Sequence, residues 1–344
     1  MAKANYYFRE IKTTKNDPIK SSIMNSFNTT QMLQSFAIGI DIGGTSLKCG
    51  VVNQLGEVVF SYLVPLKNAK TEKEIISLIV IAILQCADKL NEPVVGVGIG
   101  FPGVIDNDTI IGGGDNLPSF KQLELGKTLK KLTGYNIAID NDANLMGLGE
   151  LIYGAAKDCS DAVFLTVGTG IGGAIMINNK LHGGYKNRGA ELGHIIIQQN
   201  GLVCSCGGSG CLEAYASVTS LIEYYKTLNK SLLEEIDGKY IIEKYLTGEV
   251  YAIKAMERHF DYLAAGIASY VNIFSPQKVV IGGGISESGQ FYIDELTRRT
   301  KSLAIPVALY QTQIVSASLG NKAGILGCCA NVFQKFKTLD YATK

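Results

Sequence analysis

The sequence lacks three features that would assign it at once to a common class of protein. It has no excess of charge, because 32 Lys and Arg residues are balanced by 31 Asp and Glu residues. A balanced charge creates no strong field for nucleic acid or an anionic membrane, so neither is an expected partner. The longest apolar run, 75–84, has about half of the ~20 residues that span a bilayer. The first 20 residues contain no apolar segment typical of a secretory signal, so we expect a cytoplasmic protein.

The cysteines are better explained by free thiols or a metal than by disulfides, because eight occur without a secretory signal. Three of them, Cys204, Cys206 and Cys211, lie within eight residues and are separated by glycines that permit sharp turns. His194 would complete a Cys3His set, and a closed set of four ligands is typical of structural zinc. The alternative is three free thiols in a loop, but the spacing favours zinc. The other five cysteines are scattered in apolar segments, which predicts thiols in the core.

Glycine is abundant, and its 39 residues cluster at the ends of β-branched segments, which indicates tight turns that approach a ligand. Residues 36–40 predict a strand that runs into the turn 41–45, and a second strand leads to a polar hairpin at 53–56. The same order of strand, Gly/Thr turn, strand and polar hairpin returns at 162–181. This repetition predicts an α/β protein with two related domains that face each other. Thr71, with Glu74 three residues on, predicts a capping box at the start of a helix, and a last helix is expected at about 318–335.

Three glycine-containing segments resemble nucleotide-binding motifs, and none of them qualifies. Residues 98–103 match the dinucleotide fingerprint as a string, but they contain Pro102 and lead into Val104 and Ile105. Residues 168–173 fit the dinucleotide fingerprint, yet a strand-like segment follows them where that motif needs a helix. Residues 126–128 end like a P-loop but lack its first glycine. A Gly/Thr turn can still hold phosphate, because glycines let successive N–H groups point at an anion. The turns at 41–45 and 168–173 would clamp a triphosphate from two sides, and the alternative is two ordinary hairpins.

Most of the chain, from about Ile38 to the last expected helix, resembles the repressor–ORF–kinase (ROK) family of sugar kinases. The segments that carry the resemblance are 41–48 (DIGGTSLK), 100–103 (GFPG), 115–118 (DNLP), 141–144 (NDAN), 166–173 (TVGTGIGG), 191–194 (ELGH) and 204–213 (CSCGGSGCLE). The last two segments are the most specific, because they distinguish ROK proteins from other actin-like kinases.

The resemblance implies the actin-like ATPase fold, of the ribonuclease H-like type, with a cleft between two α/β domains. We expect an N-terminal extension at 1–35 and a small domain at 36–140 that is completed by about 322–344. We expect a large domain at 141–321, which carries the zinc-binding loop.

The same resemblance implies ATP-dependent phosphorylation of a hexose, with ATP, Mg²⁺ and structural Zn²⁺. Asp142 is the candidate catalytic base, because the positive end of a helix favours an ionised carboxylate that can accept a hydroxyl proton. The alternative is a plain helix cap, a role that Asn141 could also fill. The implied sugar-binding residues are Asn116, Asn141, Asp142, Glu191, His194 and Glu213. The implied ATP- and phosphate-binding residues are Asp41, Gly43, Gly44, Thr45, Lys48, Thr169, Gly170, Gly282, Gly283 and Gly284, and Asp41 is also the candidate Mg²⁺ ligand.

Glucose is the expected hexose, and N-acetylmannosamine, N-acetylglucosamine and fructose stay open. The main alternative is a sugar-responsive transcriptional regulator, since such ROK proteins carry a winged-helix domain before the first phosphate motif. Residues 17–30 resemble the start of that domain, but the 35 residues before Phe36 leave no room for a recognition helix and a wing. We therefore expect a kinase, or a sensor without a complete DNA-binding domain.

A nucleotide-driven interaction protein of the actin type is disfavoured by the cysteine cluster. The family also implies a homodimer or homotetramer.

Overall fold

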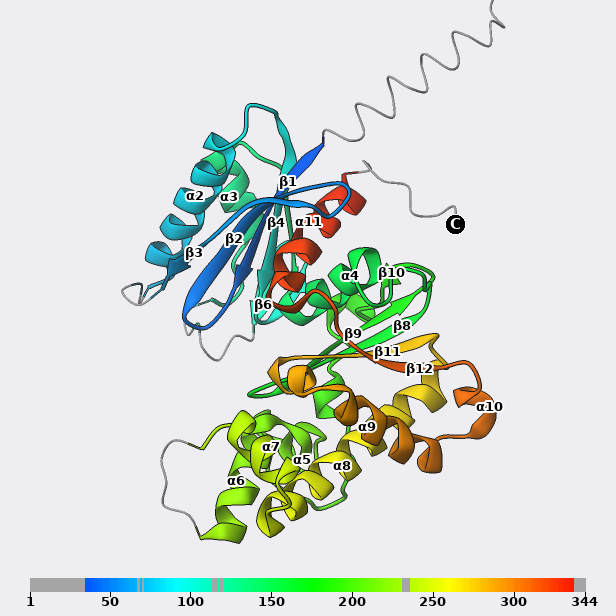
Figure 1. Ribbon diagram of the computed structural model, residues 1–344. Helices are drawn as coiled ribbons and strands as arrows, with labels where there is room; N and C mark the ends of the chain where they lie inside the picture. The colour runs from blue at the N-terminus through cyan, green and yellow to red at the C-terminus, as the bar shows by residue number, and fades with distance from the viewer. Residues whose placement is uncertain are drawn as a thin grey trace, which may run out of the picture.

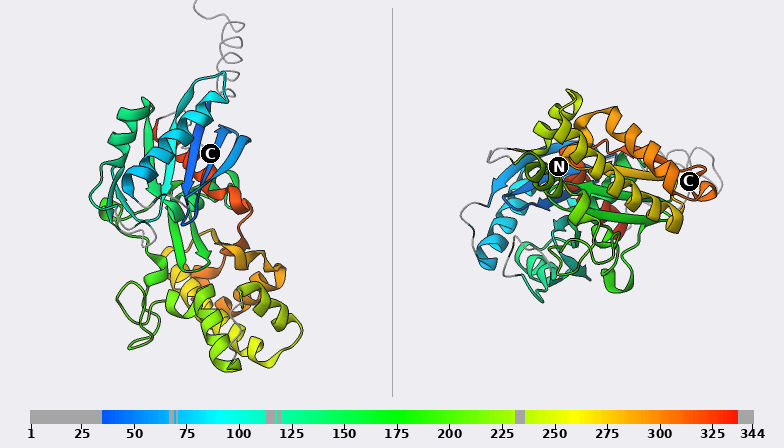
Figure 2. Two further views of the ribbon diagram at one scale, coloured as in Figure 1. Left: turned by 90° about the vertical axis from the view of Figure 1, so that its left-hand side faces the viewer. Right: turned by 90° about the horizontal axis from the view of Figure 1, so that it is seen from below.

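The computed structural model describes residues 35–66, 69, 71–112, 117, 120–230 and 236–336. In these ranges the chain forms two bodies, each built around a five-stranded sheet, and Figure 1 shows one body above the other. The same two bodies are seen when the molecule is turned by 90° (Figure 2, left). The expected N-terminal extension lies almost entirely outside the described residues.

The first body contains the sheet β3-β2-β1-β4-β7, in which β1 pairs antiparallel with β2 and parallel with β4. Its strands are β1 (Phe36–Ile42), β2 (Ser46–Asn53), β3 (Val58–Pro65), β4 (Val94–Phe101) and β7 (Ile137–Asn141). Helices α2 (Glu72–Asp88) and α3 (Leu125–Thr133) lie on one face of this sheet (Figure 1). A separate hairpin, β5 (Val104–Asp106) and β6 (Thr109–Gly112), follows β4.

The second sheet repeats the first in strand order and direction. It has the order β10-β9-β8-β11-β12, with β8 antiparallel to β9 and parallel to β11. Its strands are β8 (Ala162–Val167), β9 (Ile171–Ile177), β10 (Lys180–Leu181), β11 (Lys278–Gly282) and β12 (Gln313–Ser316). The predicted repetition of an α/β unit is therefore confirmed, and it places a glycine-rich turn at the end of β1 and another at the end of β8.

The helices of the second body cover the face of its sheet that points away from the first body (Figure 1). They are α5 (Glu213–Ala216), α6 (Val218–Asn229), α7 (Gly238–Leu246), α8 (Val250–Phe274), α9 (Gln290–Leu303) and α10 (Pro306–Leu309). Their apolar faces form one core with the sheet, in which Phe260 and Tyr292 are fully buried. Short 3-10 turns η1 (Tyr185–Asn187), η2 (Leu192–His194), η3 (Gly284–Ser288) and η4 (Gly320–Lys322) join these elements.

Several element ends follow from local sequence chemistry. Thr71 and Glu74 form the predicted capping box at the start of α2. Asn178 and Asn179 both have positive φ, as a two-residue turn between β9 and β10 requires. The last helix was expected to begin at about Ser318, and that expectation is wrong by five residues: α11 spans Ala323–Lys335.

Two helices cross between the sheets. Helix α4 (Asp142–Tyr153) packs against β9 of the second sheet, and α11 packs against β1 and β4 of the first. They approach so closely that a Cβ at Gly327 would lie 1.7 Å from the carbonyl oxygen of Leu145. A glycine is required at this crossing because any side chain would collide with the backbone of α4. Within the described ranges, no helix combines the length and apolar character needed to cross a membrane.

Candidate functional site

A cavity of about 660 Å³ lies where the end of β4, the start of α4 and the turn after β8 meet. Its walls include eight of the predicted site residues: Asn141, Asp142, Thr169, Gly170, Glu191, His194, Cys206 and Glu213. These residues are separated by as many as 72 positions in the sequence, and the fold brings them to one place. Asn116 lies outside the described residues.

Asp142 is the first residue of α4, directly after the N-cap Asn141. Its Oδ1 accepts a hydrogen bond of 2.9 Å from the N–H of Ala143. Burial raises the pKa of Asp142 to about 6; that N–H opposes the shift, and the negative charges of Asp41 and Glu191 add to it. The carboxylate is therefore a stronger base than an ordinary aspartate, and it is still ionised at pH 7.

Asn141 holds the start of α4 in place. Its Oδ1 accepts from the N–H of Asn144 at 3.1 Å, and its Nδ2 donates to the carbonyl of Gly103 at 3.2 Å. Asn141 therefore supplies the helix cap that the sequence left open to either residue, and Asp142 lines the cavity. Cap and candidate base are thus two neighbouring residues with separate tasks.

Asp41 lies at the end of β1, beside the strand that leads to the cavity. It is buried, and Nζ of Lys48 lies 3.3 Å from its Oδ2. Burial raises the pKa of Asp41, and the Lys48 charge opposes that shift. A Cβ placed on Gly100 would lie 3.5 Å from Oδ1 of Asp41 and 3.6 Å from Cα of Asp142, so the two acids flank Gly100. The two carboxyl groups are close enough for the negative charge of Asp41 to contribute to the raised pKa of Asp142.

The predicted phosphate segments lie at the ends of strands. Gly44 and Thr45 are exposed in the turn between β1 and β2, where Gly43 N–H bonds the carbonyl of Ser46 at 3.0 Å. Thr169 is exposed in the turn between β8 and β9. At the end of β11, Gly283 has φ 88°, and a Cβ there would lie 2.2 Å from the carbonyl oxygen of Val167. The β8 and β11 ends therefore touch through a position that only glycine can fill. The wall of the 660 Å³ cavity does not include the residues of the β1–β2 turn, and it does not include Gly282–Gly284.

Glu213 connects three parts of the site. Its Oε2 accepts from the N–H of Ile171 at 2.8 Å, and its Oε1 accepts from Oγ of Ser205 at 3.1 Å. A Cβ on Gly170 would lie 2.4 Å from Oε2, so the glycine makes room for this carboxylate. The glycine-rich turn, the cysteine loop and α5 are thus held together by one side chain.

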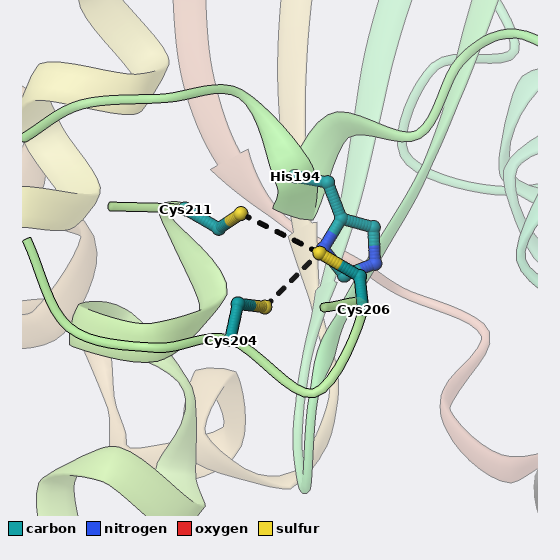
Figure 3. A group of neighbouring side chains, drawn as sticks. All are labelled: His194, Cys204, Cys206 and Cys211. Carbon is teal, nitrogen blue, oxygen red and sulfur yellow. Dashed lines mark hydrogen bonds between the residues drawn. The ribbon is translucent and has the colours of Figure 1, made fainter. Parts of the chain in front are cut away.

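The three clustered cysteines and His194 point toward one another (Figure 3). Their candidate ligand atoms all lie within 4.8 Å of one another. Sγ of Cys206 and Cys211 are 3.7 Å apart, and Sγ of Cys204 lies 3.6 Å from Nδ1 of His194. Zinc bonds of about 2.3 Å to sulfur and about 2.0 Å to nitrogen, at the tetrahedral angle, require separations of about 3.8 and 3.5 Å. The residues therefore fit a Cys3His zinc ion, and the use of Nδ1 leaves Nε2 of His194 for the cavity.

Three residues near the site were missed in the sequence. Ser205 lines the cavity and holds Glu213, and Asp140 and Asn187 bond to each other beside Asn141. Asp140 precedes the Asn-Asp-Ala-Asn segment directly, so a polar residue at the end of a buried strand was the available signal. No sequence signal indicates that Asn187 reaches it from 47 positions away.

The comparisons with known proteins agree with this geometry. The ROK family model matches residues 37–335. A glucokinase of Thermotoga maritima is 34% identical over 310 residues, which cover 87% of this chain and 97% of that protein. A putative xylose repressor of Caldicellulosiruptor sp. is 32% identical and matches 86% of this chain and 77% of its own length.

Among solved structures, a ROK family glucokinase from Streptomyces griseus, in complex with glucose and AMPPNP, superimposes with a TM-score of 0.74. It is 30% identical, and the match covers 86% of this chain and 98% of that one. These likenesses confirm the expected two-domain α/β fold of the actin-like type. On the match over residues 37–335, the chain belongs to the ROK family.

Proposed function

We propose that the chain transfers the terminal phosphoryl group of ATP to a hydroxyl group of a hexose, with glucose as the first candidate. One observation carries the proposal: a carboxylate with a raised pKa, Asp142, faces a cavity that a glycine-rich turn and several fixed polar side chains share. Phosphoryl transfer depends mainly on positioning and on charge, and this cavity offers groups for both.

Asp142 is the general base in this reaction. It accepts the proton of the sugar hydroxyl while that oxygen forms a bond to the terminal phosphorus. The bond between this phosphorus and the bridging oxygen breaks, and its electron pair leaves with ADP. A base is most effective when its pKa lies near the working pH, so a pKa of about 6 suits this task better than that of an exposed aspartate.

Asn141, Glu191, His194 and Glu213 orient the sugar. Each lines the cavity together with Asp142 and offers a hydrogen-bonding group. A site built to bond hydroxyl groups rejects analogues that lack them, because its own polar groups are then left without partners. Asn116 belongs to the same proposed set, on the resemblance alone.

The turns at the ends of β1 and β8 bind the phosphates of ATP. Thr45 and Thr169 are exposed there, and glycines flank both. Backbone N–H groups and a threonine hydroxyl in such a turn form an anion site. Lys48, paired with Asp41, adds a positive charge beside the first turn. When Mg²⁺ is bound, it offsets phosphate charge, and Asp41 is the residue that would hold it.

Zinc has a structural role in the proposal. His194, Cys204, Cys206 and Cys211 would hold it, which fixes the imidazole ring of His194 and the loop that carries Ser205. A ligand whose second ring nitrogen faces the substrate is oriented by the metal that holds the first. The zinc therefore shapes the sugar pocket and takes no part in the transfer itself.

The relatives support the kinase and also supply the second candidate. The Thermotoga maritima glucokinase matches along almost its whole length, whereas the xylose repressor matches over 77% of its length. A regulator that responds to a sugar would use the same pocket for binding and would lack turnover. This difference separates the two candidates by experiment.

The test is an ADP-release assay with ATP, Mg²⁺ and a panel of glucose, mannose, fructose, N-acetylglucosamine and N-acetylmannosamine. Turnover on glucose above the other sugars is the expected result. Turnover on an N-acetylhexosamine instead would keep the kinase and change its substrate. Sugar-dependent thermal stabilisation without ADP release from any sugar would overturn the kinase and support the sensor.

A further inference from the structure

An amide–carboxylate contact links the two sides of the proposed sugar site. Nδ2 of Asn187 donates to Oδ1 of Asp140 at 3.0 Å and to the carbonyl oxygen of Ile105 at 3.0 Å. Asp140 and Ile105 belong to β7 and β5 in the first body. Asn187 ends η1, which follows β10 of the second sheet. One amide group therefore joins the two bodies beside the cavity, although Asn187 is not in the cavity wall.

On the first body, the contact reaches the segment that carries the proposed base. The same Oδ1 of Asp140 accepts from the N–H of Asn141 at 2.7 Å and from Nδ2 of Asn144 at 2.9 Å. Asn144 is buried, and its own N–H bonds the side chain of Asn141. A single oxygen atom thus fixes the backbone of Asn141 and, through it, the direction of the next residue, Asp142.

On the second body, Asn187 lies four residues before Glu191 in a loop that is tied down at several points. The N–H of Gly189 bonds the carbonyl of Gly183 at 2.7 Å and closes the loop. The N–H of His194 bonds the carbonyl of Glu191 at 3.0 Å. A displacement of Asn187 is therefore transmitted to Glu191 and His194, because little of the intervening backbone is free to absorb it.

The loop is shaped to admit this amide. A Cβ on Gly183 would lie 1.7 Å from Oδ1 of Asn187. Gly183 does not have a positive φ, so its own backbone would accept alanine. The added Cβ would displace the amide of Asn187 and would lie 3.1 Å from its Cα. Glycine at this position thus leaves the space in which the Asn187 amide lies.

We propose that Asn187 and Asp140 are positioning residues for hexose binding. Their contact fixes the separation between Glu191 and His194 on one side of the cavity and the Asn141–Asp142 pair on the other. The inference rests on the proposed function, because it assigns the contact to the same sugar site. Its direct consequence is on sugar affinity, since the phosphate turns do not take part in it.

The test compares Asn187→Ala and Asn187→Asp with the same changes at Asn179. Asn179 is a matched control, because it has φ 62° against 54° at Asn187 and lies at the tip of the β9–β10 hairpin. Hexose binding is measured by calorimetry, and kcat and KM are measured for hexose and ATP. We expect Asn187→Ala to weaken hexose binding about tenfold, as the loss of a hydrogen bond to a charged group does. The KM for ATP should stay within about twofold of wild type.

Asn187→Asp should be the more damaging change, although it is nearly isosteric. Its carboxylate would face Asp140, and like charges in contact repel. A role limited to filling space would give the opposite order, with Asp milder than Ala. Gly183→Ala should reproduce the Asn187→Ala effect, and the double variant should lose little more, because both changes remove the same contact.

The experiment distinguishes a failure of the positioning role from a failure of the proposed function. A wild type that turns over a hexose, together with Asn187 variants that bind it like the Asn179 variants, would overturn the positioning role alone. An equal rise in the KM for ATP and hexose would also overturn it, because it would indicate general damage. A wild type that binds no hexose would overturn the proposed function and the positioning role with it.

Discussion

The two glycine-rich turns, at the ends of β1 and β8, share a scaffold but differ in the origin of their acidic partner. In the first, Asp41 ends the strand itself and pairs with Lys48, seven residues along the chain. In the second, the carboxylate is Glu213, which bonds the N–H of Ile171 from 42 residues away. The repeat thus supplies one acid locally and receives the other from the region that carries the cysteine loop.

Two units with the same strand order therefore surround their turns with different partners. The strand order fixes where the turns lie, and the surrounding elements determine what each turn contacts. We infer that the first turn acts on the phosphate and metal side alone. The second turn is linked through Glu213 to Ser205 of the cysteine loop, and so to the proposed sugar and zinc side. Variants at each turn test that division.

The largest effect is expected at Asp142, the proposed general base in the cavity wall. Asp142→Asn should lower kcat about a thousandfold while hexose affinity stays close to wild type, because an amide cannot accept the hydroxyl proton. Steady-state kinetics and calorimetry measure the two quantities, with Asp158→Asn on an exposed loop as the control. A kcat near that of the control variant would show that Asp142 is not the general base.

The wild-type pH profile tests the same group. Because the pKa of Asp142 is raised to about 6, its ionised form is lost as the pH falls through that value. The kcat should therefore be flat between pH 7 and 8 and decline below about pH 6, roughly tenfold per pH unit once the group is mostly protonated. A profile without this decline would contradict the role of Asp142 as the base.

The division between the turns is tested by a pair of amide variants. Asp41→Asn should lower kcat/KM for ATP about a hundredfold, because it leaves the Lys48 charge unpaired and removes the candidate Mg²⁺ ligand. Glu213→Gln keeps an acceptor for the Ile171 N–H and should instead raise the KM for hexose about tenfold. If both variants changed the same kinetic constant, the two turns would not have separate tasks.

The coupling of the cysteine loop to the sugar side is tested by Cys206→Ser. Loss of one ligand should empty the zinc site and weaken hexose binding about tenfold or more, because His194 and the loop then lose their support. Metal analysis and calorimetry are the measurements. Cys159→Ser is the control, since this thiol is buried elsewhere in the second body. A zinc-free variant with full sugar affinity would contradict the coupling.

Acid should destabilise the second body through a buried histidine that the first body lacks. All three histidines of the chain lie at 182, 194 and 259, outside the first body. His259 is buried in α8 with its Nε2 2.7 Å from the hydroxyl of Tyr292, and burial lowers its pKa to about 4. In the unfolded chain its pKa is near 6.5. The free energy of unfolding should thus be unaffected by His259 above pH 6.5 and fall between pH 6.5 and 4, by up to about 3 kcal/mol.

Urea unfolding at pH 7.5 and pH 5 measures this loss. His259→Gln should lose less stability between the two pH values than wild type, whatever its stability at pH 7.5. His182→Gln, at an exposed position, should lose as much as wild type. An unchanged pH dependence in the His259 variant would exclude this histidine as the cause.

The smallest effect is expected at Ala190, which precedes Glu191 and has φ 66°. A left-handed backbone is unfavourable for alanine by about 1 kcal/mol, and glycine removes that strain. Ala190→Gly should therefore raise the melting temperature by a few degrees, whereas Ala265→Gly inside α8 should lower it. Destabilisation by Ala190→Gly would mean that the loop depends on its β-carbon.

Much of the architecture was readable from local chemistry. The Thr71–Glu74 capping box, the Asn178-Asn179 hairpin and the repeated strand–turn–strand unit each depend on residues close in sequence, and each is present. The four-residue Cys/His cluster was also predictable, because its members span only 18 residues and are separated by glycines. The structure brings eight predicted residues to one cavity, although it does not test their roles.

The features that the sequence did not reveal depend on contacts between residues that are far apart along the chain. Glu150 is fully buried and accepts from the N–H groups of Ser318 and Leu319, 168 and 169 positions away. Just after these two residues, Gly320 has φ 52°, a left-handed conformation that interrupts a helical path, and α11 begins at Ala323. The Asn187–Asp140 contact escaped notice for the same reason, since periodicity says nothing about which distant polar groups meet.

The position of α11 has a consequence for the order of events during synthesis. This helix covers β1 and β4, and its Ile325 and Phe333 are part of the core against the first sheet. The first sheet is complete at β7, yet α11 leaves the ribosome roughly 180 residues afterwards, which takes about 10 to 40 s at ordinary translation rates. Until then, one face of the nascent first sheet lacks its cover. The first body can therefore complete its core only after nearly the whole of the second body has been synthesised.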